Sequence, residues 1–492
     1  MQPHRSLPHQ PGTFRELWAV AIPLVLSSGS LSLMHVIDRV FLTWHSTDAL
    51  AAAMPAGMMH WTVISVVLGM VTYVNTFVAQ YDGAGRTDRA AAAVWQGCYL
   101  SLFSGVLFLF VVGFSDEIFA LLKHAASVQR LEAQYFSILC VGSAPVTLSC
   151  CLSCFFSGRG DTKTVMYVNL VAVAVNGVLA YGLIFGKAGL PQLGIAGAGL
   201  ATVFAHLAAV AMYVAMLLRR RERIEYGFWR NRGFDRELFG RLLRYGLPTG
   251  FQYFAEISGF TVFIFLVGSI GKNELAATSL AFNLNSLAFI PMLGVGTAVM
   301  TLVGRRIGEQ RPALAVRTTW IAFGLTATYM LAFAAVYVFL PNAVLALYSL
   351  QGSAEDFGPI RELVYMLLRF VALYSFFDAM AIVFGSAVRG AGDTRFSLVF
   401  TAIAGWSLMV VPTAIAFWFY GGNLTIGWGA CSVYVTVVGL GFLWRFQAGK
   451  WKSMRVIEET PTAAPTSIGQ PHFVQHAATE TADMIEPTIA SR

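Results

Sequence analysis

Long apolar runs, separated by short polar segments, recur along almost the whole chain. Each run has at least the roughly 20 residues that a helix needs to cross the hydrocarbon core of a bilayer. Strands of a membrane barrel would be about 10 residues long and would alternate apolar with polar residues, so the runs indicate helices. The pattern predicts twelve membrane-spanning helices, at residues 17–43, 51–78, 93–114, 131–156, 164–186, 194–218, 240–270, 278–303, 314–340, 361–388, 396–420 and 427–447.

The amino-acid composition supports a membrane protein. Of the 492 residues, 57% are hydrophobic and 12% are charged, whereas an ordinary soluble domain has about 25% charged residues. A soluble fold of this length could not cover its surface with so few charges. Residues 1–13 lack the short apolar segment and cleavage site of a signal peptide, so the first predicted helix should itself direct insertion. The sequence therefore predicts an all-α polytopic membrane protein.

The positive charges follow the connecting loops, although the net charge of +7 could also suggest a nucleic-acid partner. The sequence has no basic face interleaved with aromatic residues, so nucleic-acid binding is not expected. Lys and Arg gather in every second loop, on the side of the N-terminus, which is the positive-inside pattern. We therefore expect both termini in the cytoplasm and the chain in the plasma or inner membrane. The opposite loops carry Lys123, Arg130, Lys187, Lys272 and Arg361.

Matching residues recur in the two halves of the chain. Pro23 and Pro248 are 225 positions apart, and so are Gly83 and Gly308. A polar turn after the fourth predicted helix, SGRGDT, returns after the tenth as RGAGDT. Each half holds six predicted helices, and an even number brings both halves into the membrane in the same sense. We therefore expect a parallel repeat around an axis along the membrane normal, and transporters often bind substrate between such halves.

These features divide the chain into five segments. The basic run at residues 219–223 is interpreted as a topology signal on a solvated connector, with contact to anionic lipids as the alternative. Residues after about 457 are rich in Thr, Ala and Pro, which is typical of a disordered tail. The predicted segments are a disordered cytoplasmic leader (1–13), a first six-helix bundle (14–218), a basic cytoplasmic linker (219–238), a second six-helix bundle (239–447) and a disordered cytoplasmic tail (448–492).

Two carboxylates are predicted to lie inside the membrane in the second half, where each costs roughly 2.5–3.5 kcal/mol. Glu256 and Asp378 are eleven or twelve residues from the basic ends of their helices, so both lie ~16–18 Å from the same side. Tyr374 shares the helical face of Asp378. We expect these oxygens to bind a hard cation such as Na⁺ or to hold protons. The alternative is a buried acid that hydrogen-bonds to Ser or to the backbone.

Asp38 is the one acid well inside a predicted helix of the first half. His35 precedes it by three residues on the same face, and Arg39 follows it directly. One interpretation is a second proton or substrate-cation site. The other is a charge pair of Asp38 with Arg39 or His35 near the outer end of the helix. Pro23 removes a backbone hydrogen bond from the same helix and is expected to let it kink.

Several motifs together resemble the multidrug and toxic compound extrusion (MATE) family. They are VIDRV around Asp38, VAQYDGAGRTDRA after the second helix, and the turns SGRGDT and RGAGDT. The resemblance covers about residues 14–447. It implies two V-shaped six-helix bundles around a central cavity, and the exchange of a drug-like cation for Na⁺ or H⁺. Glu256, Tyr374 and Asp378 resemble the cation site of the family's NorM branch.

Asn176 and Thr202 are polar residues in the fifth and sixth predicted helices. By themselves they are equally well explained by hydrogen bonds between helices. With Asp38 they match the positions of a first-half cation or proton site in another branch of the family. This chain departs from that branch at Ala180, where the branch has Asp, and at Arg39, where the family usually has a small hydroxyl residue. The missing carboxylate argues against a complete Na⁺ site in the first half.

The leading hypothesis is a secondary active exporter of amphipathic, mostly cationic compounds, driven by Na⁺ or H⁺ antiport. We expect it to need no cofactor and no metal beyond the coupling ion, and to act as a monomer in the lipid bilayer. A flippase for lipid-linked saccharides, which related folds include, is the alternative, but it would need a larger and more basic cavity. An enzyme is not expected, because motifs such as HExxH and GxSxG are absent from the sequence.

Overall fold

The structure, a computed structural model, describes residues 10–120, 125–349, 354–419 and 421–458. All the helices lie in one compact unit that ends at Ile457. The first nine residues of the predicted leader, and the predicted tail from residue 459 onward, lie outside the described residues.

Each half is built almost entirely from helices. In the first half they are α1 (Phe14–His45), α2 (Thr47–Thr72), α3 (Val74–Gly83), α4 (Thr87–Val112), α5 (Ser115–Ala120), α6 (Ala126–Val141), α7 (Ser143–Gly158), α8 (Thr162–Phe185) and α9 (Ile195–Leu217). The short helix α10 (Arg220–Glu225) lies between the halves in sequence. In the second half they are α11 (Arg236–Gly268), α12 (Lys272–Gly308), α13 (Pro312–Phe339), α14 (Pro341–Ser349), α15 (Ala354–Ala391), α16 (Thr394–Ala404), a π-helical stretch (Gly405–Val410), α17 (Val411–Phe419) and α18 (Leu424–Gln447).

The membrane-spanning helices agree with the predicted ones. Within the described residues, eleven helical stretches are long and apolar enough to cross a membrane, and the bent pair α6–α7 makes a twelfth. The 43° bend in this pair lies at Gly142, and Pro145 follows in α7, where proline cannot donate the usual backbone hydrogen bond. By contrast, α1 continues through Pro23, so the kink predicted there does not interrupt the helix.

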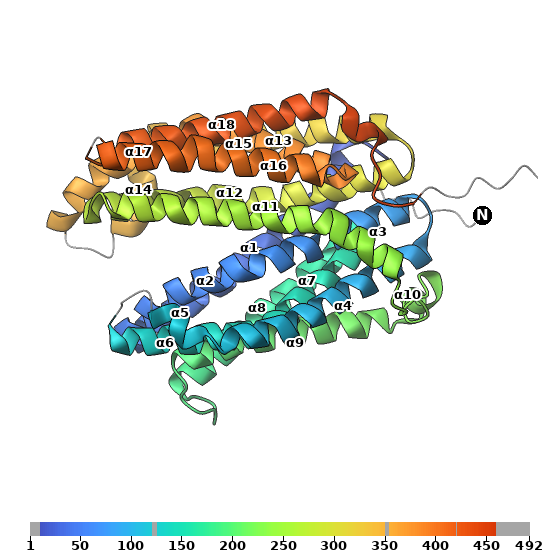
Figure 1. Ribbon diagram of the computed structural model, residues 1–492, viewed down its shortest axis with the longest axis horizontal. Coiled ribbons are helices and arrows are strands. Elements are labelled where there is room, and N and C mark those ends of the chain that lie inside the picture. Colours follow the sequence, from blue (N-terminus) through green and yellow to red (C-terminus); the bar gives the residue numbers. More distant parts are fainter. Residues whose placement is uncertain (1–9, 121–124, 350–353, 420, 459–492) are drawn as a thin grey trace, which may run out of the picture. The chain divides into compact units, whose positions relative to one another are not determined.

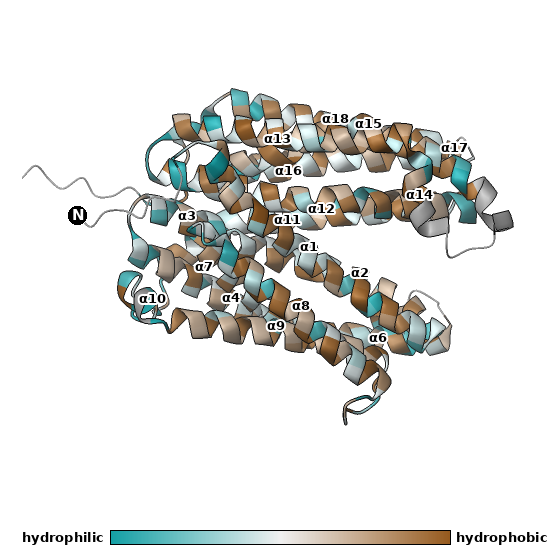
Figure 2. Ribbon diagram, turned by 180° about the vertical axis from the view of Figure 1, so that it is seen from behind, coloured by the Kyte–Doolittle hydropathy of each residue, from teal (hydrophilic) through white to brown (hydrophobic). Residues whose placement is uncertain are grey.

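Apolar side chains cover the outer surfaces of the helices. On α4, for example, Leu102, Phe103, Val106 and Phe110 are all more than half exposed. Figure 2 shows hydrophobic residues along the helices and hydrophilic residues at their ends and in the loops. Such extensive exposed apolar surface is suited to lipid rather than to water.

The two halves meet through close backbone contacts that occur in symmetric pairs. A Cβ on Gly69 of α2 would lie only 2.5 Å from Cα of Gly250 in α11. A Cβ on Gly294 of α12 would lie 2.6 Å from the backbone nitrogen of Val25 in α1. Gly69 and Gly294 are 225 positions apart, and so are Val25 and Gly250. The same helix crossing is therefore formed twice, as a parallel repeat around one axis requires.

A second pair of contacts follows the same symmetry. A Cβ on Gly83 would lie 2.2 Å from the carbonyl oxygen of Arg305. A Cβ on Gly308 would lie 2.1 Å from the carbonyl oxygen of Gln80, and Gln80 and Arg305 are again 225 positions apart. The matching glycines noted in the sequence are thus the positions where each half approaches the backbone of the other, which a side chain would prevent.

Polar contacts join the halves at this same end of the helices. Arg306, in the last turn of α12, forms a buried ion pair with Glu16, in the first turn of α1. The Tyr73 hydroxyl, between α2 and α3, donates to the carbonyl oxygen of Arg389 in the last turn of α15 at 2.9 Å. Figure 1 shows α1, α2 and α3 beside the second group of helices. The halves are therefore closed against each other at the end where α1 begins.

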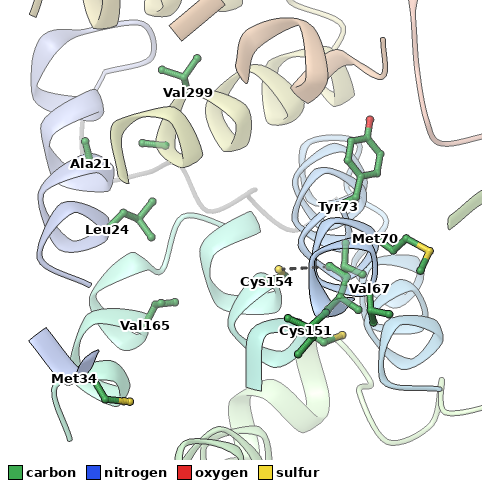
Figure 3. Packing of buried hydrophobic residues seen from close by; sticks show 14 of the residues in the cluster. Ala21, Leu24, Met34, Val67, Met70, Tyr73, Cys151, Cys154, Val165 and Val299 are labelled. Atoms are coloured by element: carbon green, nitrogen blue, oxygen red, sulfur yellow. Dashed lines mark hydrogen bonds between the residues drawn. The ribbon is translucent and has the colours of Figure 1, made fainter. Parts of the chain in front are cut away.

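Apolar packing fills the space between these polar contacts. Ala21 and Leu24 of α1 and Val299 of α12 are all buried in one continuous core. Figure 3 shows the two α1 residues beside the helix that carries Val299. The core thus extends from one half into the other.

The linker at residues 219–238 does not fit the interpretation of a solvated connector. Phe228 is fully buried, and its carbonyl oxygen accepts a hydrogen bond from Nε1 of Trp95 in α4 at 2.8 Å. Arg159, just after α7, forms an ion pair with Glu222 and stacks on Tyr226. Burial opposes the charge of Arg159, but the hydrogen bond with Glu222 and the nearby negative charges of Glu222 and Asp161 together raise the pKa of the guanidinium. The linker is folded onto the first half because its aromatic residues bury apolar area there.

The predicted disordered tail also begins later than residue 448. Residues Lys450–Ser453 form a 3₁₀ helix. The indole of Trp451 is fully buried and stacks on Phe446 with ring centroids 5.0 Å apart. The Val456 amide donates to Oε1 of Gln80 in the first half at 3.0 Å. The first ten residues of the predicted tail are therefore ordered, because they bury apolar side chains that the overall polar composition obscures.

Candidate cation and substrate site

A cavity of about 610 Å³ lies mainly within the second half. Residues of α11, α12, α15, α16 and α18 line it, and the first half contributes Thr72 and Tyr73. Its walls are largely apolar, and polar side chains enter it at a few positions. These polar residues include Gln252, Tyr253, Glu256, Asn285, Tyr374, Asp378, Arg389 and Tyr434.

Glu256 and Asp378, which the sequence placed at equal depth, line this one cavity together with Tyr374, which shares the helical face of Asp378. Within the described part of the chain, Asp378 has no hydrogen-bond partner, and Glu256 accepts a hydrogen bond from Nε2 of Gln252 at 2.9 Å. Neither acid is bonded to Ser or to the backbone. The structure therefore does not show the alternative, in which each buried acid hydrogen-bonds to Ser or to the backbone. Asp378 presents an unpaired carboxylate to the cavity.

Two amide side chains that sequence analysis did not assign complete this set. Gln252 lies one turn before Glu256 on α11, and Nδ2 of Asn285 on α12 donates to the Tyr374 hydroxyl at 3.5 Å. The carbonyl oxygens Oε1 of Gln252 and Oδ1 of Asn285 are buried without a partner. The i, i+4 spacing of Gln252 and Glu256 was a signal available in the sequence. No signal in the sequence indicated that α12 packs against α15, which is the contact that places Asn285 beside Tyr374.

The residues around the cavity fit a hard cation by their chemistry. Two carboxylates, a phenol hydroxyl and two unpaired amide oxygens are oxygen ligands of the kind that alkali and alkaline-earth ions prefer. The same carboxylates could instead take up protons, because a charged acid is costly in a partly apolar cavity. Both choices for a coupling ion therefore remain chemically open at this site.

The first-half residues Asp38, Asn176 and Thr202 are also brought together. Oγ1 of Thr202 donates to Oδ2 of Asp38 at 3.1 Å, and Nδ2 of Asn176 lies 3.4 Å from the Thr202 hydroxyl oxygen. All three side chains are buried. Oδ1 of Asp38 and Oδ1 of Asn176 have no partner. The described residues form no ion pair with Asp38, so the alternative of a charge pair with Arg39 or His35 is wrong.

Within the part of the chain that the structure describes, His35 forms no hydrogen bond or ion pair with this cluster. Its ring is exposed and packs edge-on against Trp61 of α2, with ring centroids 6.0 Å apart. The i, i+3 spacing placed His35 on the side of Asp38, and the imidazole contacts Trp61 of the neighbouring helix. Two other polar pairs in the first half, His60 with Ser143 and His206 with Ser149, join helices through hydrogen bonds of 3.1 and 3.0 Å.

Replacing Thr202 tests whether the hydroxyl holds the Asp38 carboxylate. Thr202→Val keeps the shape and leaves a buried carboxylate oxygen without its donor, which costs about 1–3 kcal/mol. We expect a lower midpoint of thermal unfolding for the detergent-solubilised protein, whereas Thr202→Ser, which keeps the hydroxyl, should lose much less. Equal unfolding midpoints for the Val and Ser variants would contradict this role of the hydroxyl.

The fold and the site together define a class of protein. Two parallel six-helix halves, closed against each other at one end, with unpaired carboxylates in an internal cavity, are features of a membrane transporter. The family model MatE matches residues 23–182 and 248–415, one stretch in each half. The chain belongs to the MatE family. Its members in the comparisons below are transporters and not enzymes.

Relatives of known name span nearly the whole chain. The probable multidrug resistance protein NorM of Burkholderia mallei (strain ATCC 23344) is 29% identical over 431 residues, which is 87% of this chain and 91% of the relative. The probable multidrug resistance protein NorM of Thermotoga maritima is 24% identical over 451 residues, covering 90% of this chain and 94% of the relative. The resemblance to the NorM branch is thus confirmed.

Solved structures show the same fold. An outward-facing multidrug resistance MATE family transporter of the MOP superfamily superposes with a TM-score of 0.81 at 19% identity, covering 89% of this chain and 97% of that chain. A MOP superfamily transporter from Pyrococcus furiosus, described as having a binding pocket of reversed polarity, gives a TM-score of 0.78 at 20% identity over the same shares. The predicted fold class is therefore confirmed.

Proposed function

We propose that this protein is a secondary active multidrug exporter. It moves amphipathic compounds that carry a positive charge out of the cell, in exchange for Na⁺ or H⁺. The observation that carries the proposal is the cavity that holds the Glu256 and Asp378 carboxylates without a fixed positive partner for Asp378. Multidrug resistance names among the relatives support drug-like cargo. The cavity supports export better than the flipping of lipid-linked saccharides, because its acids favour cationic cargo.

The proposed orientation follows from the loop charges. Both termini lie in the cytoplasm, and the helices span the plasma or inner membrane. The contacts between the halves then close the cytoplasmic end, and the cavity is accessible from outside. A single chain contains both halves and the whole site, so we propose that it works as a monomer surrounded by lipid.

The coupling follows from competition for the same carboxylates. Outside cations or protons, one for each carboxylate, neutralise Glu256 and Asp378 and release a positively charged compound outward. The neutralised site then permits the transition that opens the cytoplasmic end, where the ion leaves and the next compound binds. Because a ligand shifts an equilibrium only by its differential affinity for the two states, the ion must bind the outward-facing site more tightly than the inward-facing one.

Imposed gradients test the function and identify the ion. Purified protein in proteoliposomes, with a Na⁺ gradient and a proton gradient imposed separately, should accumulate or expel an ethidium-type dye under one of the two. Protein-free liposomes provide the control for leakage. If neither gradient moves dye faster than in those liposomes, antiport of cationic compounds is not the function.

A further inference from the structure

Arg389 is a charged residue of the cavity that the coupling scheme does not use. It lies in the last turn of α15 and lines the same cavity as Glu256 and Asp378. Its Nη2 donates to the hydroxyl of Ser386, also a cavity residue, at 3.3 Å. Within the described residues, no carboxylate forms an ion pair with Arg389. Its guanidinium therefore faces the cavity with most of its five donors unused.

Three other arginines at this end of the second half are paired with carboxylates. Arg306 is paired with Glu16, Arg305 with Glu309 at 3.2 Å, and Arg445 with Asp393 at 2.6 Å. Arg389 differs because it joins the two halves through its backbone: its carbonyl oxygen accepts the hydrogen bond from Tyr73. Its charged side chain takes no part in that contact. The side chain is thus available to a molecule in the cavity.

The charges of the cavity are separated along α15. Asp378 and Arg389 are eleven positions apart, which is ~16 Å along a helix axis. Apart from Ser386, which bonds to the guanidinium, the wall between them on α15 is apolar, with Ala381 and Ile382, and Phe442 of α18 also lines the cavity. The cavity therefore has a negative part, an apolar wall and a positive end.

A bound molecule that carries only a positive charge leaves the guanidinium unpaired. If it fills the cavity, it also displaces water from Arg389 and adds like-charge repulsion. A molecule of the same body with a carboxylate at its far end forms a charge-assisted, bidentate ion pair there instead. Discrimination between the two arises because one molecule forms this ion pair and the other is repelled.

We propose that Arg389 sets the specificity of this exporter, so that it favours zwitterionic amphiphiles, with a cationic group and a carboxylate at opposite ends, over pure cations of the same scaffold. This inference rests on the proposed function and names its preferred substrate class. Glu256 and Asp378 receive the cationic group, and Arg389 receives the carboxylate.

The test compares two dyes that share one scaffold and differ only in the carboxylate. Rhodamine 110 has a free carboxylate on a xanthylium cation, and rhodamine 123 is its methyl ester. Binding of each dye to the purified protein in detergent is measured by fluorescence polarisation, and gradient-driven transport is measured in proteoliposomes. We expect the wild type to prefer the acid, and Arg389→Gln to reduce the acid-to-ester ratio of affinities about tenfold or more. Binding of the ester should be kept or improved.

Two further variants separate charge from structure. Arg389→Lys keeps a positive charge but loses the planar fork, so an intermediate ratio is expected. Arg395→Gln removes an exposed charge six residues away that does not line the cavity, and its ratio should equal that of the wild type. The ratio does not depend on how much of a preparation is folded, because both dyes report on the same binding-competent molecules.

The outcomes distinguish this inference from the proposed function. An unchanged ratio in Arg389→Gln, or equal losses for both dyes, would overturn the role of Arg389 while gradient-driven transport of the ester by the wild type still supports export. If the wild type moves neither dye under either gradient, the proposed function fails and the inference fails with it.

Discussion

Glu256→Gln and Asp378→Asn are each expected to abolish gradient-driven export while leaving the protein folded. Each change keeps the size of the side chain but removes both the negative charge and the ability to bind a proton. A charge-assisted contact in such a site is worth about 1.5–3 kcal/mol. Losing it at either acid should therefore reduce transport by roughly 10- to 100-fold, toward the rate in protein-free liposomes.

The control for these variants lies on the same helix. Glu237→Gln changes an exposed acid in the first turn of α11, where the side chain is 71% exposed and pairs with Arg241. It removes the same charge without touching the cavity, so export should remain at the wild-type rate. Wild-type export in both cavity variants would refute the assignment of Glu256 and Asp378.

Equilibrium binding of a dye provides a second measurement on the same variants. If the carboxylates bind both the ion and the cargo, the wild type should bind a cationic dye less tightly when the coupling ion is added. In Asp378→Asn the coupling ion should no longer weaken dye binding, because the amide has no negative charge to attract a cation and does not take up a proton. Fluorescence polarisation of the dye, with Na⁺ varied at fixed pH and then pH varied without Na⁺, measures it.

Gly250→Ala should have the second large effect, on the balance between the two facing states. A Cβ at this position would lie 2.2 Å from the carbonyl oxygen of Val66, and this backbone atom cannot rotate away as a side chain can. Overpacking of this kind costs about 1–3 kcal/mol. The contact lies at the end where the two halves close against each other. The state in which this end is closed should therefore lose population by roughly ten- to hundredfold.

The change in population can be followed by thiol labelling. A cysteine at Thr297, which lines the cavity, should react with an impermeant maleimide added outside when the outer end is open. Gly250→Ala should slow that reaction and reduce export. Gly240→Ala is the matched control, because it lies on the same helix with no atom within 4 Å of the added Cβ. Equal labelling in the two alanine variants would show that the close contact does not hold the closed end.

Much of the fold was predictable because its signals are local. The length of an apolar run is decided by the thickness of a bilayer, so twelve helices could be located without any knowledge of their neighbours. The offset of 225 positions between Gly83 and Gly308 likewise revealed the parallel repeat. Where apolar residues were sparse, as around Trp451 and Phe228, the local composition was misleading, since burial there depends on a surface supplied by distant helices.

The site was only partly predictable for the same reason. Depth along a helix is a local property, so Glu256 and Asp378 could be placed at one level. The direction in which a side chain turns depends on its neighbours, as His35 shows by packing against Trp61. Gln252 and Arg389 became candidates only when α11, α12 and α15 were seen around one cavity.

The sequence by itself determined the class of this protein, its helices, its internal repeat and the two buried carboxylates, because hydrophobic length and the cost of a charge in lipid act on each segment separately. Only the tertiary structure decided which end is closed, which oxygens surround the acids and that Arg389 lines the cavity without a carboxylate partner among the described residues. Those properties depend on the packing of helices far apart in the chain, and in particular on the glycine contacts that bring the two halves together.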